Sequence, residues 1–436
     1  MLLLHISDIH FRTPDCRNPD MDPDRAYRTL LLRDARARIA KIGPLGAIVV
    51  TGDIAYKGDP EEYCAASDWL SELAQACGCA LERIFVVPGN HDVDRHVVSG
   101  SPSVRNAQQA IFNAPEQQRE REFRTQFTDR ETGPVLLAPL AAYNDFAKLY
   151  NCQVYSPDRL SWKQDLPLTD GIRLRLHGLT STMLSGFGDR DTKPGSLYLS
   201  PLQTALDPVD DVVNVVLSHH PPDWFLDADD VDDVLSNRAA IQLLGHKHRQ
   251  RVTLNNGYAR FSAGAVNPDR NEPGWQPGYN LIEVRATGTG ANRMLEVDAH
   301  VLLLQASPEQ FVPRRASDGV DIFRHRLPIP ETTNPSGHSI AADVVAVEAR
   351  SHAIADATAD ANVEASMSDE QTRNLIYRFW SLTGSQRREI ALGLGLITEE
   401  DLRRPEPERY GRALLNAHER GLLDQVAVEV AKREKK

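Results

Sequence analysis

The feature that most constrains the fold is a pattern in the first 92 residues, where short apolar runs alternate with amphipathic stretches. The apolar runs cover residues 2–6, 47–50 and 83–87, and the amphipathic stretches cover residues 25–42 and 61–76. Short apolar, β-branched runs are typical of buried strands, whereas apolar residues at helical spacing indicate helices. Strands that alternate with helices predict helices packed on a sheet that contains parallel strands. The sequence therefore predicts an α/β (α+β) fold.

The alternation is interrupted after this segment. Residues 95–165 are polar with scattered aromatic side chains, and we interpret them as a mostly helical insertion. Further strands are predicted at residues 172–179, 212–217, 239–244, 258–262 and 279–284, and residues 295–304 are expected to close the sheet. The run at 239–244 could equally be a buried helix, because periodicity does not separate the two in so short a run.

The composition of the chain changes after residue 306. Five prolines interrupt residues 308–335, and Ala, Asp and Ser dominate the residues that follow, which is typical of a partly irregular linker. Helical periodicity resumes at Ser368. We therefore predict a large α/β domain at 1–306, a linker at 307–365 and a small helical domain at 366–436.

Five short polar segments carry chemically active side chains. They are Asp8-Ile9-His10, Gly52-Asp53, Gly89-Asn90-His91-Asp92, His219-His220-Pro221-Pro222 and Gly245-His246-Lys247-His248. The first three come directly after predicted strands, and the fourth follows the apolar run at 212–217. Sites in open α/β sheets gather at the carboxyl ends of the strands. We therefore expect these segments to meet in one crevice, although they lie far apart in the sequence.

The side chains of these segments form a coherent set of metal ligands. Carboxylate oxygens, imidazole nitrogens and one amide oxygen suit divalent Mn, Fe or Zn, and the segments contain no cysteine for a thiolate zinc site. Seven candidate ligands are too many for one tetrahedral site, so they predict two metals that share a carboxylate. Two cations about 3.5–4 Å apart neutralise a phosphodiester and lower the pKa of a bound water. A histidine beside them, not bound to metal, can protonate the leaving oxygen.

Simpler interpretations exist for single residues and segments. A Gly-Asp pair such as Gly52-Asp53 is usually just a turn. His220 is favoured as a core histidine with satisfied hydrogen bonds. Arg249 and Arg251 could contact substrate phosphates, but a solvated surface is the more usual role of such residues. The joint occurrence of all five segments in this order favours the metal site.

In this order, the segments resemble the motifs of the calcineurin-like metallophosphoesterase superfamily over roughly residues 1–300. The resemblance implies a β-sandwich of mixed sheets flanked by helices. It implies that one metal is held by Asp8, His10, Asp53 and His248. It implies that the other is held by Asp53, Asn90, His219 and His246, with Asp53 bridging. It further implies that His91 lies next to the scissile phosphate without binding metal, and that Asp92 orients it.

These residues predict a metal-dependent phosphodiesterase with two divalent ions, of which Mn is the expected metal and Fe or Zn the alternatives. A small diester such as a cyclic nucleotide is the first substrate candidate, because a formal net charge of −12 offers no obvious nucleic-acid track. A nuclease acting on DNA or RNA is second, and a protein phosphatase is third. A different class of function is an interaction protein whose metal domain is a sensor or a relic.

The end of the chain carries a second resemblance. Helical segments are predicted at 412–418 and 422–432. Residues 419–425, which join the two segments and include the start of the second, have the sequence Glu-Arg-Gly-Leu-Leu-Asp-Gln. This ending resembles the small death-fold-like effector-associated domains of bacterial signalling and defence proteins. It implies a protein partner that binds through the helical domain.

Cysteine usage and hydropathy predict the compartment. The chain has five cysteines at irregular spacing, which argues against a disulfide framework and favours a reducing environment. The first residues lack a basic region and a long apolar core, and no run of about 18 apolar residues occurs. We therefore expect no signal peptide, no membrane span and a cytoplasmic location.

Overall fold

The computed structural model describes residues 1–169, 171–188, 190–267, 275, 277–289, 292–316, 319–329, 375–376, 378–380, 382, 384–398, 401 and 406–434. It divides into two compact units, Met1–His338 and Ser339–Lys436, which are treated separately below.

Three parallel strands form one side of the first sheet: β1 (Leu2–Ile6), β2 (Leu45–Val50) and β3 (Ile84–Val86). Every side chain of β1 is buried, as expected for a strand that is covered on both faces. The antiparallel strands β10 (Gly278–Thr287), β11 (Met294–Ala306) and β12 (Glu309–Pro313) complete the order β12-β11-β10-β1-β2-β3. A further strand, β13 (Phe323–Pro328), also pairs with β11.

The second sheet has the order β4-β5-β6-β7-β9-β8. Its strands are β4 (Trp162–Thr169), β5 (Ile172–Gly178), β6 (Val212–Ser218), β7 (Ile241–Leu244), β8 (Arg251–Asn255) and β9 (Tyr258–Ser262). Strands β5, β6, β7 and β9 are parallel to one another. One continuous cluster of buried apolar side chains includes residues of both sheets, such as Leu4 and Val215. The main hydrophobic core therefore joins the two sheets.

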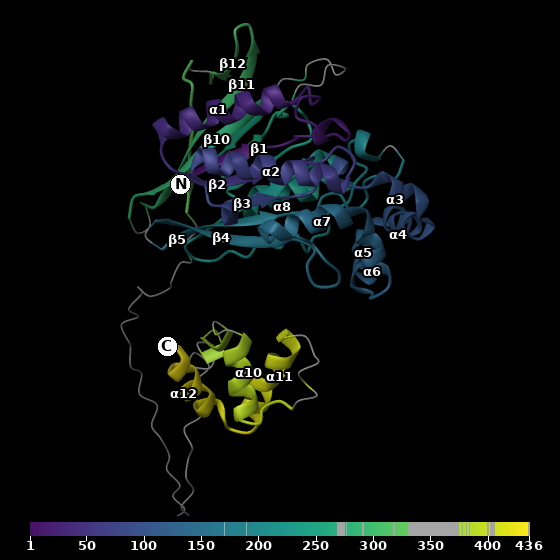
Figure 1. Ribbon diagram of the computed structural model, residues 1–436, viewed down its shortest axis with the longest axis vertical. Helices are drawn as coiled ribbons and strands as arrows, with labels where there is room; N and C mark the ends of the chain where they lie inside the picture. The colour runs from purple at the N-terminus through teal and green to yellow at the C-terminus, as the bar shows by residue number, and fades with distance from the viewer. Residues whose placement is uncertain are drawn as a thin grey trace, which may run out of the picture. The chain divides into compact units, whose positions relative to one another are not determined.

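Helices flank the sheets (Figure 1). The helix α1 (Arg25–Ile42) is tied to the first sheet, because Tyr279 Oη donates to Asp34 at 2.6 Å and Arg38 donates to the Phe311 carbonyl at 3.0 Å. The helix α8 (Ala228–Arg238) is tied to the second sheet through an ion pair between Asp232 and Arg260. The other α-helices among the described residues of this unit are α2 (Pro60–Cys77), α3 (Arg95–Gly100), α4 (Pro102–Asn113), α5 (Glu116–Thr128), α6 (Thr132–Leu137) and α7 (Ala141–Ala147). The predicted fold, mixed sheets flanked by helices, is confirmed.

Edge strands account for the main differences from the predicted elements. Strand β4 begins at Trp162, within the last residues of the segment expected to be helical, and its alternating burial leaves only Trp162 and Leu166 buried. Its Pro167 is tolerated because β4 is an edge strand. Residues 295–304 do not close the sheet, because β12 and β13 extend it to residue 328, within the segment assigned to a linker. The open choice at 239–244 is settled as strand β7.

The second unit has a core of its own. Its described helices are α10 (Gly384–Gly393), α11 (Glu406–Glu419) and α12 (Leu423–Glu434), and Phe379, Tyr410 and Val426 are among the side chains buried between them. The helices predicted at 412–418 and 422–432 correspond to α11 and α12, whereas the start expected at Ser368 lies outside the described residues. Across the described parts of both units, we find no helix with the length and apolar character needed to span a membrane.

Candidate metal centre

The five polar segments meet at the carboxyl ends of parallel strands. They follow β1, β2 and β3 of the first sheet and β6 and β7 of the second. Backbone hydrogen bonds join the segments within each sheet: the Asp8 N–H donates to the Gly52 carbonyl at 3.0 Å, and the Gly245 N–H donates to the His219 carbonyl at 3.1 Å. The predicted convergence of distant segments is therefore observed.

One cluster contains two carboxylates and two imidazoles. The ligand atoms of Asp8, His10, Asp53 and His248 all lie within 4.8 Å of one another. His10 Nε2 is 3.2 Å from Asp53 Oδ2, and His248 Nε2 is 3.1 Å from Asp8 Oδ1. Both carboxylates are completely buried. Because burying unpaired charge is costly, two adjacent buried carboxylates suit a site for a cation.

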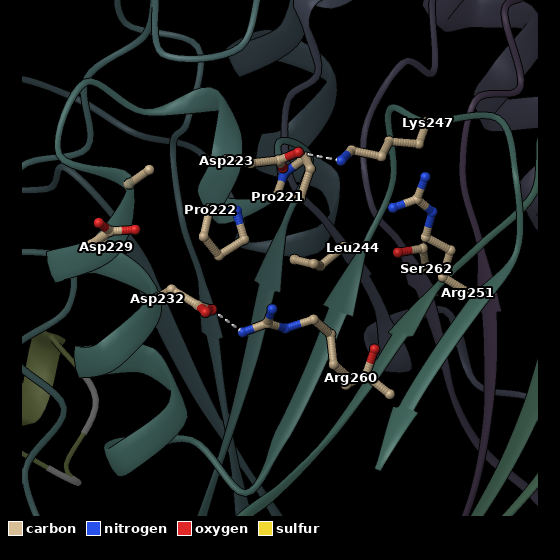
Figure 2. Close-up of a pocket in the computed structure, with 12 residues that line it drawn as sticks. Pro221, Pro222, Asp223, Asp229, Asp232, Leu244, Lys247, Arg251, Arg260 and Ser262 are labelled. Atoms are coloured by element: carbon tan, nitrogen blue, oxygen red, sulfur yellow. Dashed lines mark hydrogen bonds and ion pairs between the residues drawn. The ribbon is translucent and has the colours of Figure 1, made fainter. Parts of the chain in front are cut away.

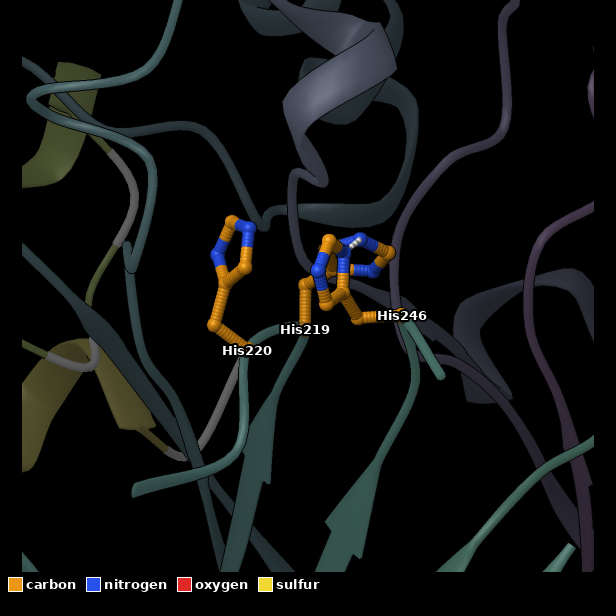
Figure 3. Close-up of side chains that lie close together, drawn as sticks. All are labelled: His219, His220 and His246. Carbon is orange, nitrogen blue, oxygen red and sulfur yellow. Dashed lines mark hydrogen bonds between the residues drawn. The ribbon is translucent and has the colours of Figure 1, made fainter. Parts of the chain in front are cut away.

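A second cluster contains histidines and an amide. Asn90 Oδ1 lies 3.1 Å from His219 Nε2 and 3.0 Å from His246 Nδ1, and these two ring nitrogens are 3.3 Å apart. Figure 3 shows the rings of His219 and His246 close together, with His220 to one side, and the planes of the two rings are inclined at 75°. The Nδ1–H of His219 donates to the Thr51 carbonyl at 2.8 Å. In the neutral ring the Nε2 lone pair therefore points into the cluster, the arrangement in which an outer hydrogen bond orients a metal-binding histidine.

Asp53 lies between the two clusters. Its Oδ2 atom is 3.2 Å from His10 Nε2 and 3.3 Å from His219 Nε2, so one oxygen reaches a ring from each cluster. Its Oδ1 atom accepts a hydrogen bond from the His91 N–H at 2.8 Å. The donor set contains only oxygen and nitrogen atoms, and it fits two divalent ions.

The pKa shifts of the site also indicate that its buried carboxylates favour a positive charge beside them. Burial disfavours a charged ring at His219, but Asp53 and Asp8 outweigh burial and raise its pKa to about 9. Burial and the nearby charge of His219 lower the pKa of His246 to about 3. In the metal-free protein, a proton on His219 therefore takes the place of a cation.

Metal uptake at pH 8 is accordingly expected to release about one proton for each protein chain, because His219 must be neutral to bind a metal. The measurement is calorimetry of Mn²⁺ binding in buffers with different ionisation enthalpies. Affinity should fall as the pH is lowered, since protons then compete more strongly for the ring. A binding heat that is independent of the buffer would contradict this expectation.

Five of the seven predicted ligands have a left-handed backbone conformation. The φ angles are 54° at Asp8, 53° at His10, 53° at Asp53, 69° at His246 and 50° at His248. Residues other than glycine rarely adopt such angles, which cost on the order of 1 kcal/mol or more each. Strained residues cluster at functional sites, and here the strain coincides with the residues that carry the proposed ligands.

His91 lies at the edge of the clusters. Its Nδ1–H donates to the Tyr56 carbonyl at 2.8 Å, and its ring stacks on Tyr56 with a centroid separation of 5.1 Å. The His10 ring is 4.7 Å away. The expected partner of this ring was Asp92, but the Tyr56 backbone holds it instead.

Asp92 has a different set of partners. Its carboxylate accepts hydrogen bonds from the N–H groups of Gly89 at 2.8 Å and Ala55 at 2.9 Å, and from the Tyr63 hydroxyl at 2.9 Å. Burial and the nearby Asp53 raise the pKa of Asp92 to about 6. Asp92 thus joins the segment that carries Asp53 to the segment that carries Asn90.

Asp92→Asn is expected to lower the free energy of unfolding by about 1–3 kcal/mol, because an amide group would face backbone N–H donors that now have an acceptor. Urea denaturation of the metal-free protein measures this loss. The exposed Asp68→Ala on α2 is a control for a lost carboxylate, and it should leave the stability within about 0.5 kcal/mol of the original. Equal midpoints for Asp92→Asn and the original chain would contradict the proposed role.

His220 does not fully match its favoured interpretation. It is completely buried, and its Nδ1 lies 2.9 Å from Ser181 Oγ. Its Nε2 has no hydrogen-bond partner among the residues that the structure describes, and its ring is 4.5 Å from that of His246. Only one of its two ring nitrogens is therefore satisfied within the core.

The clusters open into a cleft of about 650 Å³. Its walls include four cationic side chains, namely Arg95, Lys247, Arg249 and Arg251.

Aromatic side chains surround the clusters, and the sequence analysis did not single them out. Trp224 lies 4.5 Å from the His246 ring, and Trp275 stacks on His248 at 3.8 Å. Tyr56 follows Asp53 by three residues, and Trp224 follows His219 by five. This closeness in the sequence to predicted ligands could have indicated that both side chains lie near the site. No comparable signal marks Trp275.

Comparisons with known proteins agree with these observations. A family model described as calcineurin-like phosphoesterase matches residues 1–250, and a model described as GTPase-associated adaptor domain matches residues 371–432. The second match confirms the predicted adaptor-type module at the end of the chain.

The similarity to individual proteins is lower. The uncharacterized metallophosphoesterase-like protein YydB of Bacillus subtilis (strain 168) is 28% identical over 96 residues, or 21% of this chain and 18% of that protein. The alignment thus spans less than a fifth of the relative. Similar solved structures include Vps29 of Entamoeba histolytica complexed with zinc, with a TM-score of 0.28 and 11% identity over 76% of this chain and 99% of that one. GAP50 of Plasmodium has a TM-score of 0.37 and 12% identity, and the match covers 76% of this chain and 90% of that one.

Proposed function

The chain belongs to the calcineurin-like phosphoesterase family, and on this basis we propose that it is a two-metal phosphodiesterase acting on a nucleotide-type phosphodiester. The observation that carries the proposal is the position of Asp53, whose Oδ2 atom lies within 3.3 Å of a ring from each cluster. A carboxylate in this position can be shared by two ions, as two-metal hydrolysis of phosphoesters requires.

The proposed ligands divide between the two clusters. One ion would be held by Asp8, His10, Asp53 and His248, and the other by Asp53, Asn90, His219 and His246. Mn suits this set of nitrogen and oxygen donors, with Fe and Zn as alternatives. When bound, such ions neutralise phosphate charge and make a bound water nucleophilic near neutral pH.

His91 is proposed as the proton donor to the leaving oxygen. It lines the cleft, and its Nδ1–H is engaged by the Tyr56 carbonyl, so Nε2 is the nitrogen available to exchange a proton with a substrate. A histidine held in this way contributes typically 10²–10⁴-fold as a general acid. Asp92 is proposed to act indirectly: its hydrogen bonds hold the segment that carries Asp53 against the segment that carries Asn90.

A substrate panel tests the proposal. Full-length protein is stripped of metal, reloaded with Mn²⁺, and given an aryl phosphomonoester, an aryl phosphodiester, cyclic nucleotides and single-stranded DNA. We expect hydrolysis of diesters in preference to the monoester, and none before metal is restored. Preference for the monoester, or equal rates with and without metal, would exclude a two-metal phosphodiesterase.

A nuclease is the second candidate. The chain is acidic as a whole, but Arg249 and Arg251 line the cleft and form no ion pair within the part of the chain that the structure describes. The other two cations of the walls are paired, Arg95 with Asp191 and Lys247 with Asp223. A local group of cations next to the clusters favours a substrate with more than one phosphate.

The adaptor domain is proposed to bind a protein partner and to be dispensable for the chemistry. Removal of residues 366–436 should leave kcat/KM for an aryl diester unchanged, because each unit has its own buried core. Steady-state kinetics, together with circular dichroism of the shortened chain, check this expectation. Loss of activity in a shortened chain that remains folded would show that the two parts act as one.

A further inference from the structure

A second cavity adjoins the cleft. It has a volume of about 250 Å³, and it shares Asp223, Lys247 and Arg251 with the walls of the cleft. Figure 2 shows these side chains above the strands β7, β8 and β9, with Asp229 and Asp232 of α8 on the opposite side. The two cavities are therefore neighbours that share part of one wall.

The chemistry of the second cavity suits an organic ring with polar edges. The buried residues Pro221, Pro222 and Leu244 are among the apolar residues that line it. Polar groups of both kinds surround them, because three cationic side chains are balanced by three carboxylates: Lys247, Arg251 and Arg260 against Asp223, Asp229 and Asp232. Apolar surface beside donors and acceptors of both charges can contact the face and the edges of an organic ring, and it differs from the uniformly positive lining of an anion site.

The cations of this region differ in how they are paired. Lys247 forms an ion pair with Asp223 and lies over the Trp224 ring, 5.2 Å from its centroid. Arg260 forms an ion pair with Asp232. In contrast, Arg251 is exposed and has no ion pair within the described part of the chain. Among the three cations of the second cavity, the one available for a phosphate is therefore Arg251, at the junction of the two cavities.

We propose that the substrate is a single-stranded oligonucleotide that occupies both cavities. The scissile phosphodiester and its own nucleoside lie in the cleft, Arg251 holds the next phosphate, and the attached nucleoside enters the second cavity. This inference rests on the proposed function and narrows its substrate class. A cyclic mononucleotide has neither the second phosphate nor the second nucleoside, so it would leave the second cavity empty.

The test uses two variants and three substrates with the Mn-loaded, full-length protein. Thr253→Trp fills the second cavity from an exposed position on β8 that is not part of the cleft wall, and Arg251→Ala removes the cation at the junction. The substrates are an aryl diester, a cyclic nucleotide and a DNA hexamer. Arg33→Ala, an exposed arginine on α1, is the control for loss of one positive charge.

In the original chain, kcat/KM should be at least about tenfold higher for the hexamer than for the cyclic nucleotide. Each of the two variants should lower the value for the hexamer about tenfold, and the value for the aryl diester by much less. Arg251→Ala should also reduce the slope of log(kcat/KM) against log[salt] by about 0.7, the amount expected for one contact with a single-strand phosphate. Arg33→Ala should change neither quantity.

The outcomes separate this inference from the proposed function. If the original chain hydrolyses the aryl diester but prefers the cyclic nucleotide, or if the variants lower both rates equally, the oligonucleotide site is wrong while the phosphodiesterase stands. If the original chain hydrolyses no diester, the proposed function itself fails. Melting temperatures establish whether both variants are folded. If Thr253→Trp is not folded, the results for Arg251→Ala alone decide whether the oligonucleotide site is correct.

Discussion

Asp53→Ala is expected to lower kcat/KM for an aryl diester by about 10³-fold or more, which corresponds to about 4 kcal/mol of transition-state stabilisation. The effect is large because one carboxylate serves both clusters. Its Oδ2 atom contacts His10 and His219, and its Oδ1 atom holds the backbone of His91. Removing it takes a ligand from each proposed ion and loosens the segment that carries the proposed acid.

The measurement combines steady-state kinetics in excess Mn²⁺ with metal analysis of the purified protein. Because Asp53 has a φ of 53°, alanine at this position also adds backbone strain. Asp53→Gly removes the carboxylate without that strain, so the two variants should be equally inactive, with the glycine variant more stable. Asp68→Ala, on the exposed face of α2, should retain full activity. An Asp53 variant that keeps both its metal and its turnover would refute the catalytic assignment.

Gly89→Ala should nearly abolish turnover through a single added methyl group. A Cβ atom at this position would lie 2.1 Å from Asp53 Oδ1 and 2.4 Å from the Asp53 nitrogen. The φ of Gly89 is −105°, an angle open to any residue, so the effect comes from space alone. Either Asp53 or the backbone next to Asn90 must move, and overpacking of this kind costs about 1–3 kcal/mol of stability.

Gly100→Ala is the matched control, because a Cβ atom at Gly100 meets nothing within 4 Å. It should leave the free energy of unfolding unchanged or raise it by up to about 1 kcal/mol, because alanine reduces the conformational entropy of the unfolded chain. Chemical denaturation and metal titration of both variants measure the difference. Normal Mn²⁺ affinity and turnover in Gly89→Ala would show that the contact between Gly89 and Asp53 is not required.

Much of the catalytic framework could be predicted because it depends on local pattern. The run Leu2–Ile6, apolar except for His5, gives a buried central strand, and polar residues directly after parallel strands must meet at one edge of a sheet. Strands β12 and β13 could not be predicted in this way, since edge strands bury few side chains and show little apolar signal. Their pairing with β11 depends on contacts that only the folded chain provides.

The environment of His91 shows a different limit. Its ring is held by the Tyr56 carbonyl, and the direction of a carbonyl is set by the backbone rather than by residue type. Sequence spacing pointed to the neighbouring Asp92, whose acceptor atoms are used by backbone N–H groups and a tyrosine. Net charge has a similar limit, because a total of −12 does not show that Arg95, Arg249 and Arg251 line the cleft.

The left-handed backbone at Asp8, His10, Asp53, His246 and His248 sets the stability of the fold against the choice of side chain. Glycine at any of these positions would relieve about 1 kcal/mol of strain, so mutational drift towards glycine would stabilise the fold one step at a time. The chain nevertheless carries aspartate or histidine at all five positions, so residue type and backbone conformation are in conflict there. What these side chains bind, rather than the stability of the fold, therefore accounts best for the residues at these positions.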